Sequence, residues 1–153
     1  MTADIAYVVA LTASFVWFTM GFRYFAFQAE TAAKVMVAKP HRDSPIFRTY
    51  AAGVRFLGGF NAAFALMSLL LLVCALTGST LFEDPAERAI VLFVLAAAHV
   101  SQFLPNVPIL RNGERHDDGA FWPVRSGPML MIFVVDLVET VLNLGAGVVQ
   151  LAA

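Results

Sequence analysis

Four apolar stretches, each long enough to cross a lipid bilayer, constrain this chain of 153 residues more than any other feature of its sequence. A helix needs roughly 20 mostly apolar residues to cross about 30 Å of hydrocarbon. The stretches that come close to this length are residues 5–22, 56–77, 89–110 and 129–151. Only 14% of the residues are charged, whereas soluble domains have about a quarter. We therefore predict an all-α, polytopic membrane protein, a four-helix transmembrane bundle formed by the single domain 1–153.

The basic residues are distributed unevenly over the loops between these stretches. Nine of the ten Lys and Arg residues fall in the first and third loops, and only Arg88 lies in the second. Cytoplasmic loops carry an excess of Lys and Arg, so we expect loops one and three in the cytoplasm and both termini outside. The first stretch lacks the basic flank and the cleavage site of a signal peptide, and we interpret it as a retained span.

Prolines and capping residues indicate where the helices begin and end. Ser44-Pro45 and Asp84-Pro85 each place a capping residue before a proline suited to a first helical turn, which predicts the starts of spans two and three. The two prolines of FLPNVPIL end or kink helix three, and Ser126 begins helix four. Helix one either continues to about Lys39 or is followed by a separate interfacial helix, because residues 23–39 contain neither proline nor glycine.

Small residues in span two predict the face through which it packs. Gly58 and Gly59 are each followed four residues later by an alanine, Ala62 and Ala63. Pairs of small residues at this spacing let membrane helices approach closely. We expect this face to contact a neighbouring helix.

Polar side chains form two stripes inside the third and fourth spans. With spacing i, i+3, i+7, the stripes are His99, Gln102 and Asn106 in span three and Asp136, Glu139 and Asn143 in span four. Ionisable groups at membrane depth are costly, so they face the bundle interior or a wet cavity and mark functional sites. Asn61 of span two lies near the same level, and Arg55 stands at the cytoplasmic rim just before that span. We predict that these eight residues line one polar pocket that opens toward the cytoplasm.

The two acids of span four have different expected partners. Asp136 lies nearer the rim, where we expect the guanidinium of Arg55 to pair with it. Glu139 lies deeper, with His99 as its expected neighbour. Removal from water disfavours the charged form of a carboxyl group, which is the condition for exchanging protons. If the protein is an enzyme, Glu139, Asp136 and His99 are the catalytic candidates, as general acid or base and partner. Alternatively, this polar layer serves only to hold the helices together.

Other kinds of chemistry lack a basis in the sequence. His99, Asp136 and Glu139 offer donors that Zn, Mn or Fe accept, but HExxH and Glu-x-x-His motifs are absent, so we predict no metal and no cofactor. The sequence has no nucleophile elbow, and its one cysteine, Cys74, cannot form an intramolecular disulfide. Six positive charges in the first loop are a usual cytoplasmic excess and predict no nucleic-acid partner.

A resemblance to a known family rests on the order of features from about Arg55 to Gly147. Arg55-Phe-Leu-Gly-Gly59 opens span two, an Ala- and Leu-rich segment follows, and polar residues lie in spans three and four. In this order the chain resembles the DoxX-like group of small four-helix membrane proteins. The resemblance implies a multi-pass protein of the bacterial cytoplasmic (inner) membrane, in a group associated with quinone-linked sulfur oxidation or redox stress.

Three functions from different classes are compatible with these features. The first is a membrane component, surrounded by lipid, whose pocket binds a lipophilic or quinone-like small molecule. The second is an enzyme that acts on a lipid-soluble substrate through the acids of span four and His99. The third is a proton-coupled carrier, which with only four spans would require a homo-oligomer.

Overall fold

The computed structural model describes residues 2–117 and 119–153 and confirms the predicted all-α architecture with four long apolar helices. These helices are α1 (Thr2–Phe27), α3 (Phe47–Thr77), α4 (Pro85–Phe103) and α6 (Gly127–Leu151). Each is long and apolar enough to cross a membrane. The shorter helices are α2 (Ala29–Met36), the 3-10 helix η1 (Lys39–His41) and α5 (Asn106–Arg111).

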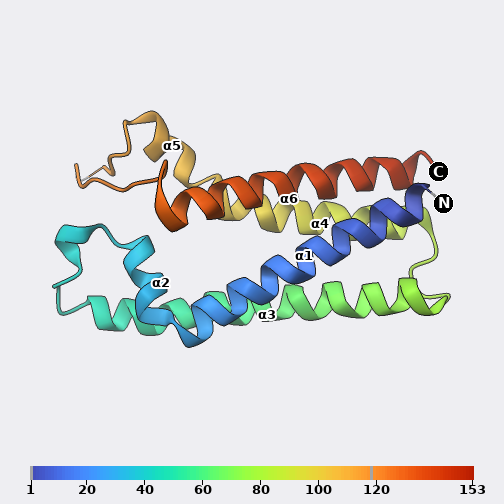
Figure 1. The fold of residues 1–153 in the computed structure, drawn as a ribbon, viewed down its shortest axis with the longest axis horizontal. Coiled ribbons are helices and arrows are strands. Elements are labelled where there is room, and N and C mark those ends of the chain that lie inside the picture. The colour runs from blue at the N-terminus through green and yellow to red at the C-terminus, as the bar shows by residue number, and fades with distance from the viewer. Residues whose placement is uncertain (1, 118) are drawn as a thin grey trace.

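The two ends of the bundle differ in what they carry. Both termini and the α3–α4 connection lie at one end, which we call the termini end (Figure 1). Helices α2 and α5 and the longer connections lie at the opposite end, which we call the loop end (Figure 1). This arrangement follows from an even number of spans, because each crossing returns the chain to the other side.

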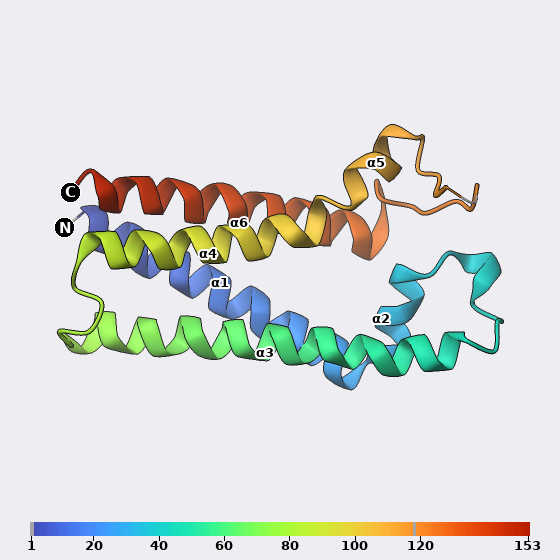
Figure 2. The ribbon, with the colours of Figure 1, turned by 180° about the vertical axis from the view of Figure 1, so that it is seen from behind.

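Helix α1 crosses the bundle diagonally and joins its two halves. It packs along α3 on one side, while α4 and α6 run side by side on the other (Figures 1 and 2). Buried apolar side chains from all four long helices form one core, which includes Tyr7, Leu11, Phe18, Ala65, Leu71, Leu92, Leu95 and Ala146. Contacts of α1 therefore position residues of α4 and α6 relative to those of α3.

The polarity of the molecule is inverted relative to that of a soluble protein. Large apolar side chains point outward, and Phe56 and Leu76 are 77% and 67% exposed. Ionisable side chains are buried instead, since His99 is 0% exposed and Asp136 is 1% exposed. Such residues are almost never fully buried in soluble proteins unless they are paired, whereas in membranes they face the bundle interior. The distribution is that of a multi-pass membrane protein.

The predicted breaks in the helices at span three are confirmed. Asp84 caps α4, because its Oδ1 accepts a hydrogen bond from the backbone N–H of Ala86 at 2.7 Å. Helix α4 ends at Phe103, and α5 begins after Pro105. Ser44 does not cap the second span, since its hydroxyl accepts a long bond of 3.4 Å from Ile46 N–H in the turn before α3.

Helix one does not continue to Lys39, and that extension is wrong. The backbone leaves helical geometry at Gln28, with φ −120° and ψ 38°, and the separate helix α2 follows. Ala32 and Ala33 of α2 pack against Ala51 and Val54 of α3. The break thus lets a small apolar face of α2 cover the loop end of α3, which a continuous helix could not reach.

The predicted small-residue face of span two is correct only in part. A Cβ added to Gly58 would lie 2.7 Å from the backbone nitrogen of Ala26, so this glycine allows α1 and α3 to touch. A Cβ added to Gly59 would meet nothing within 4 Å, and Ala63 is exposed. One residue turns a helical side chain by about 100°, which places Gly59 off the contact face that Gly58 occupies.

Candidate functional site

A cluster of buried polar side chains joins α1, α4 and α6. Nδ1 of His99 lies 2.8 Å from Oδ1 of Asp136. The same oxygen accepts a hydrogen bond of 2.9 Å from the indole Nε1–H of Trp17. His99 therefore meets an acid of the fourth span, as the sequence predicts, but its closer partner is Asp136 and not Glu139.

The second ring nitrogen of His99 faces Ser14 and Glu139. Nε2 lies 3.4 Å from Oγ of Ser14 and 4.0 Å from Oε2 of Glu139. Oγ of Ser14 is 3.5 Å from that Oε2 and also accepts a hydrogen bond of 3.1 Å from Nδ2 of Asn143. The imidazole thus lies between two carboxyl groups, in direct contact with one and connected to the other through a hydroxyl.

Aromatic stacking fixes the plane of the imidazole. The ring of Phe18 stacks on His99 with centroids 4.6 Å apart, and Phe64 in turn stacks on Phe18 with centroids 5.1 Å apart. Asn143 is held separately, because its Nδ2 also donates to the backbone oxygen of Glu139 at 2.9 Å. The ring of His99 is therefore oriented so that each nitrogen faces one acid.

Ser14, His99 and Asp136 are connected in the same way as the serine, histidine and aspartate of a catalytic triad, but Ser14 lacks the surroundings of a nucleophile. In a triad the serine must reach the reacting carbonyl. Ser14 is 0% exposed and lines neither of the two cavities beside the cluster. Its hydroxyl also accepts the bond from Asn143. We interpret Ser14 as a hydrogen-bonding link between His99 and Glu139.

Asp136 and Glu139 line two different cavities that share Trp17 as a wall. The first, which we call the inner pocket, has a volume of about 210 Å³ and is lined by residues that include Trp17, Phe18, Tyr24, Asn61, Gln102 and Asp136. The second, which we call the lateral groove, has a volume of about 500 Å³ and runs along α1 and α6, with Val9, Val16, Trp17 and Glu139 among its lining residues. The cluster around His99 therefore connects two cavities.

Six of the eight predicted pocket residues lie at this cluster or at the inner pocket. Asn61, Gln102 and Asp136 line the inner pocket, and His99, Glu139 and Asn143 belong to the hydrogen-bonded cluster. Gly21 makes room for the amide of Asn61, because an added Cβ there would overlap Oδ1 of Asn61. The two stripes of spans three and four thus meet directly, and α1 adds Ser14 and Trp17 to them.

Arg55 lies outside the pocket, and its predicted pairing with Asp136 is wrong. It is exposed and lines a separate surface groove together with Glu30 and Arg48. Helix α3 turns Val54 and Gly58 into the bundle, and Arg55 is rotated by about 100° from Val54, so that it points outward. Asp136 is held by His99 and Trp17 instead.

Asn106 is buried but does not reach the pocket. The third helix ends at Phe103, so Asn106 begins α5 and no longer continues the stripe of His99 and Gln102. Its Nδ2 is 3.5 Å from the backbone oxygen of Gln102. The predicted i+7 position holds only if the helix is unbroken, and the proline at 105 breaks it.

Two residues of the cluster, Ser14 and Trp17, were missed by the sequence reasoning. They lie three residues apart in the first span and therefore on one face of α1. The buried residues of α1, Tyr7, Ala10, Leu11, Ser14 and Phe18, follow the same spacing. A polar group on such a face was the available signal, but the surrounding span is so uniformly apolar that the buried face is not evident.

Comparisons with known proteins identify no relative. Within the described residues, no group of three or more His, Cys, Asp or Glu side chains could hold a metal ion. No protein-family model, no curated protein and no solved structure matches this chain. The geometry of the cluster and its cavities is therefore the evidence that bears on function.

Proposed function

We propose that the protein binds a lipid-soluble, quinone-like small molecule in the inner pocket and exchanges a proton with it through Asp136 and His99. One observation carries the proposal: the carboxyl group of Asp136 lines the pocket and is also the partner of His99 at 2.8 Å. An apolar cavity of about 150 Å³ binds benzene. The inner pocket, at about 210 Å³, is of the size for one substituted ring or a short piece of apolar chain.

The walls of the inner pocket suit a ring that bears a carbonyl or hydroxyl group. Trp17, Phe18 and Tyr24 supply aromatic surface. Gln102 supplies an amide, which can both donate and accept hydrogen bonds. Apolar walls with a few well-placed polar groups are typical of small-molecule sites.

The orientation and location of the protein belong to the same proposal. The positive-inside rule places the loop end, which carries most of the Lys and Arg residues, in the cytoplasm and both termini outside. The DoxX-like resemblance favours the bacterial cytoplasmic membrane. The inner pocket would then open toward the cytoplasmic half of the bilayer.

Lipid extraction of the purified full chain, followed by mass spectrometry, tests this proposal. We expect a ring-containing lipophile enriched over bulk lipid, and we expect Asp136→Asn to reduce its amount by about tenfold, since it weakens a charge-assisted hydrogen bond. Ser101→Ala is the matched control, because Ser101 lies on α4 close to His99 in sequence but is exposed. Equal amounts of the lipophile in wild type and Asp136→Asn, or none in wild type, would refute the proposal.

An enzyme that uses acid–base chemistry on a lipid-soluble substrate is the second candidate. The observation in its favour is that His99 lies between acids of both cavities, with Nδ1 at 2.8 Å from Asp136 and Nε2 facing Glu139 at 4.0 Å beside Ser14. A proton taken up at one cavity can thus be delivered at the other. The same extraction distinguishes the candidates, because an enzyme yields a chemically altered molecule whose formation stops in Glu139→Gln.

A further inference from the structure

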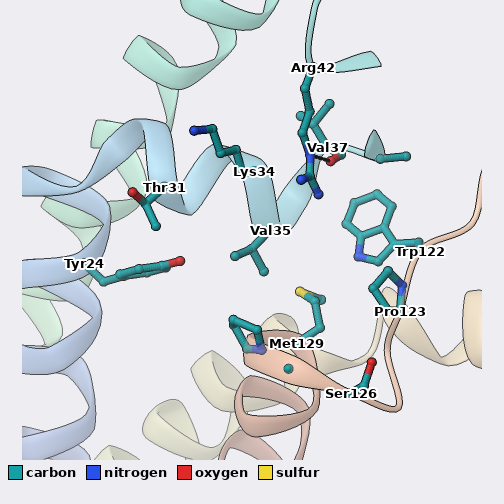
Figure 3. A pocket seen from close by; sticks show the side chains of 13 residues that line it. Tyr24, Thr31, Lys34, Val35, Val37, Arg42, Trp122, Pro123, Ser126 and Met129 are labelled. Carbon is teal, nitrogen blue, oxygen red and sulfur yellow. Dashed lines mark hydrogen bonds between the residues drawn. The ribbon is translucent and has the colours of Figure 1, made fainter. Parts of the chain in front are cut away.

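A further cavity, which we call the loop-end pocket, lies between α2, the segment that follows it and the start of α6. Its volume is about 320 Å³. Figure 3 shows Val35 and Met129 as an apolar floor, Tyr24 on one side and Trp122 on the other. The pocket therefore has an apolar base and polar groups around its sides.

The charged residues that line the loop-end pocket are both basic. They are Lys34 and Arg42. Nε of Arg42 donates a hydrogen bond of 2.9 Å to the backbone oxygen of Val37, which fixes the side chain. Its guanidinium points into the pocket beside Trp122 (Figure 3). A guanidinium fixed through Nε, whose terminal N–H groups have no protein partner within residues 2–117 and 119–153, matches the geometry of a phosphate or carboxylate.

Trp122 supplies a second and independent indication of an acceptor in this pocket. Its indole Nε1 is buried and has no hydrogen-bond partner among the described residues. Buried donors are nearly always satisfied in native proteins, so a donor at the wall of a cavity points to a partner within the cavity. The start of α6 adds to this, because Ser126 makes no side-chain bond to the first turn. Backbone N–H groups at such a start favour an anion.

The loop-end pocket adjoins the inner pocket. Tyr24 and Pro128 line both of them. A molecule with its head beside Arg42 and its apolar part beside Asp136 would pass Tyr24. The basic end of this path lies at the loop end, and its apolar end lies within the bundle.

We propose that the ligand is an anionic amphiphile, whose phosphate or carboxylate head is bound by Arg42, Lys34 and Trp122 and whose apolar part occupies the inner pocket. This inference rests on the proposed function and specifies the chemical class of its ligand. The same anionic chemistry occurs in free phosphate, which lacks the apolar part and would leave the inner pocket unused.

Native mass spectrometry of the full chain, released from a neutral detergent, tests the inference with three probes. Dodecyl phosphate has both parts, dodecanol lacks the anion, and inorganic phosphate lacks the chain. We expect dodecyl phosphate to bind at least about tenfold more tightly than either of the others, which corresponds to one charge-assisted hydrogen bond. Arg42→Gln and Trp122→Phe should each weaken its binding by about tenfold. Trp122→Phe keeps an aromatic ring at this position, so it serves as a check if Arg42→Gln folds poorly.

Arg111→Gln is the matched control, since it removes one positive charge from an exposed position on α5. It should leave binding of dodecyl phosphate unchanged. Equal loss in Arg111→Gln and Arg42→Gln, equal affinity for dodecanol, or equal affinity for inorganic phosphate would each overturn the inference. A co-purifying lipophile that depends on Asp136, together with no preference for dodecyl phosphate, would overturn this inference alone and leave the proposed function in place.

Discussion

Removal of one partner of the His99–Asp136 pair should destabilise the bundle more than removal of both. The two side chains are 0% and 1% exposed, so neither can turn to water when the other is lost. Breaking a buried pair by replacing one partner costs about 3 to 5 kcal/mol, because it leaves the other group unpaired. We expect a loss of this size in the free energy of unfolding for Asp136→Leu and for His99→Leu.

In the double variant Asp136→Leu/His99→Leu, neither member of the pair is left without its partner. The indole N–H of Trp17 still loses its acceptor, and one unsatisfied buried donor costs about 1 to 3 kcal/mol. The double variant should therefore lose only this smaller amount and be more stable than either single variant. An ordinary hydrogen bond between membrane helices contributes only about 0.6 kcal/mol, so a coupling of several kcal/mol would mark this pair as exceptional.

Equilibrium unfolding by sodium dodecyl sulfate in mixed micelles, followed by circular dichroism, measures these values. Asp43→Leu is the control, because it removes an acid from an exposed loop. Additive losses, with the double variant less stable than each single variant, would refute the reasoning. They would mean that the two side chains contribute separately and that their contact at 2.8 Å carries little energy.

Four further substitutions test packing, exposure and capping with the same unfolding assay. Gly58→Ala should lower stability by about 1 to 3 kcal/mol, because its Cβ would press on Ala26, whereas Gly59→Ala should be neutral or stabilising by about 0.5 to 1 kcal/mol. Arg55→Gln should change stability by no more than about 0.5 kcal/mol, since Arg55 is exposed, and a larger loss would restore its predicted pairing. Asp84→Ala should cost about 1 kcal/mol through loss of the cap on α4, and an unchanged free energy of unfolding would contradict this.

The number of spans and their approximate limits could be predicted because bilayer thickness sets the length of an apolar helix. The meeting of His99 with the acids of the fourth span could also be anticipated, since ionisable groups in lipid turn toward one another. The break at 105 followed from the absence of a backbone N–H in proline. These features depend on the chemistry of individual residues and on the thickness and low polarity of the bilayer.

The rotation of each helix about its axis could not be predicted from the sequence. In α3 nearly every residue is apolar or small, so the pattern does not distinguish the face of Gly58 from that of Gly59. The structure turns Gly58 toward Ala26 and Arg55 outward, and this choice depends on how α1 crosses α3. Ser14 and Trp17 were missed because the rotation of α1 is equally hidden in the sequence. Their partners also come from helices far along the chain.

Because the chain is synthesised from its N-terminus, α1 is made well before the α6 residues that it contacts. Ser14 hydrogen-bonds at a separation of 129 residues, to Asn143, and Trp17 at 119, to Asp136. A ribosome that adds about 5 to 20 residues per second needs roughly 6 to 25 s for such a distance. During that interval the first helix resides in the bilayer without these two partners. Insertion of α6 is then the event that completes the assembly, and a nascent chain halted before it would present an unmatched serine and indole to the membrane's quality-control machinery.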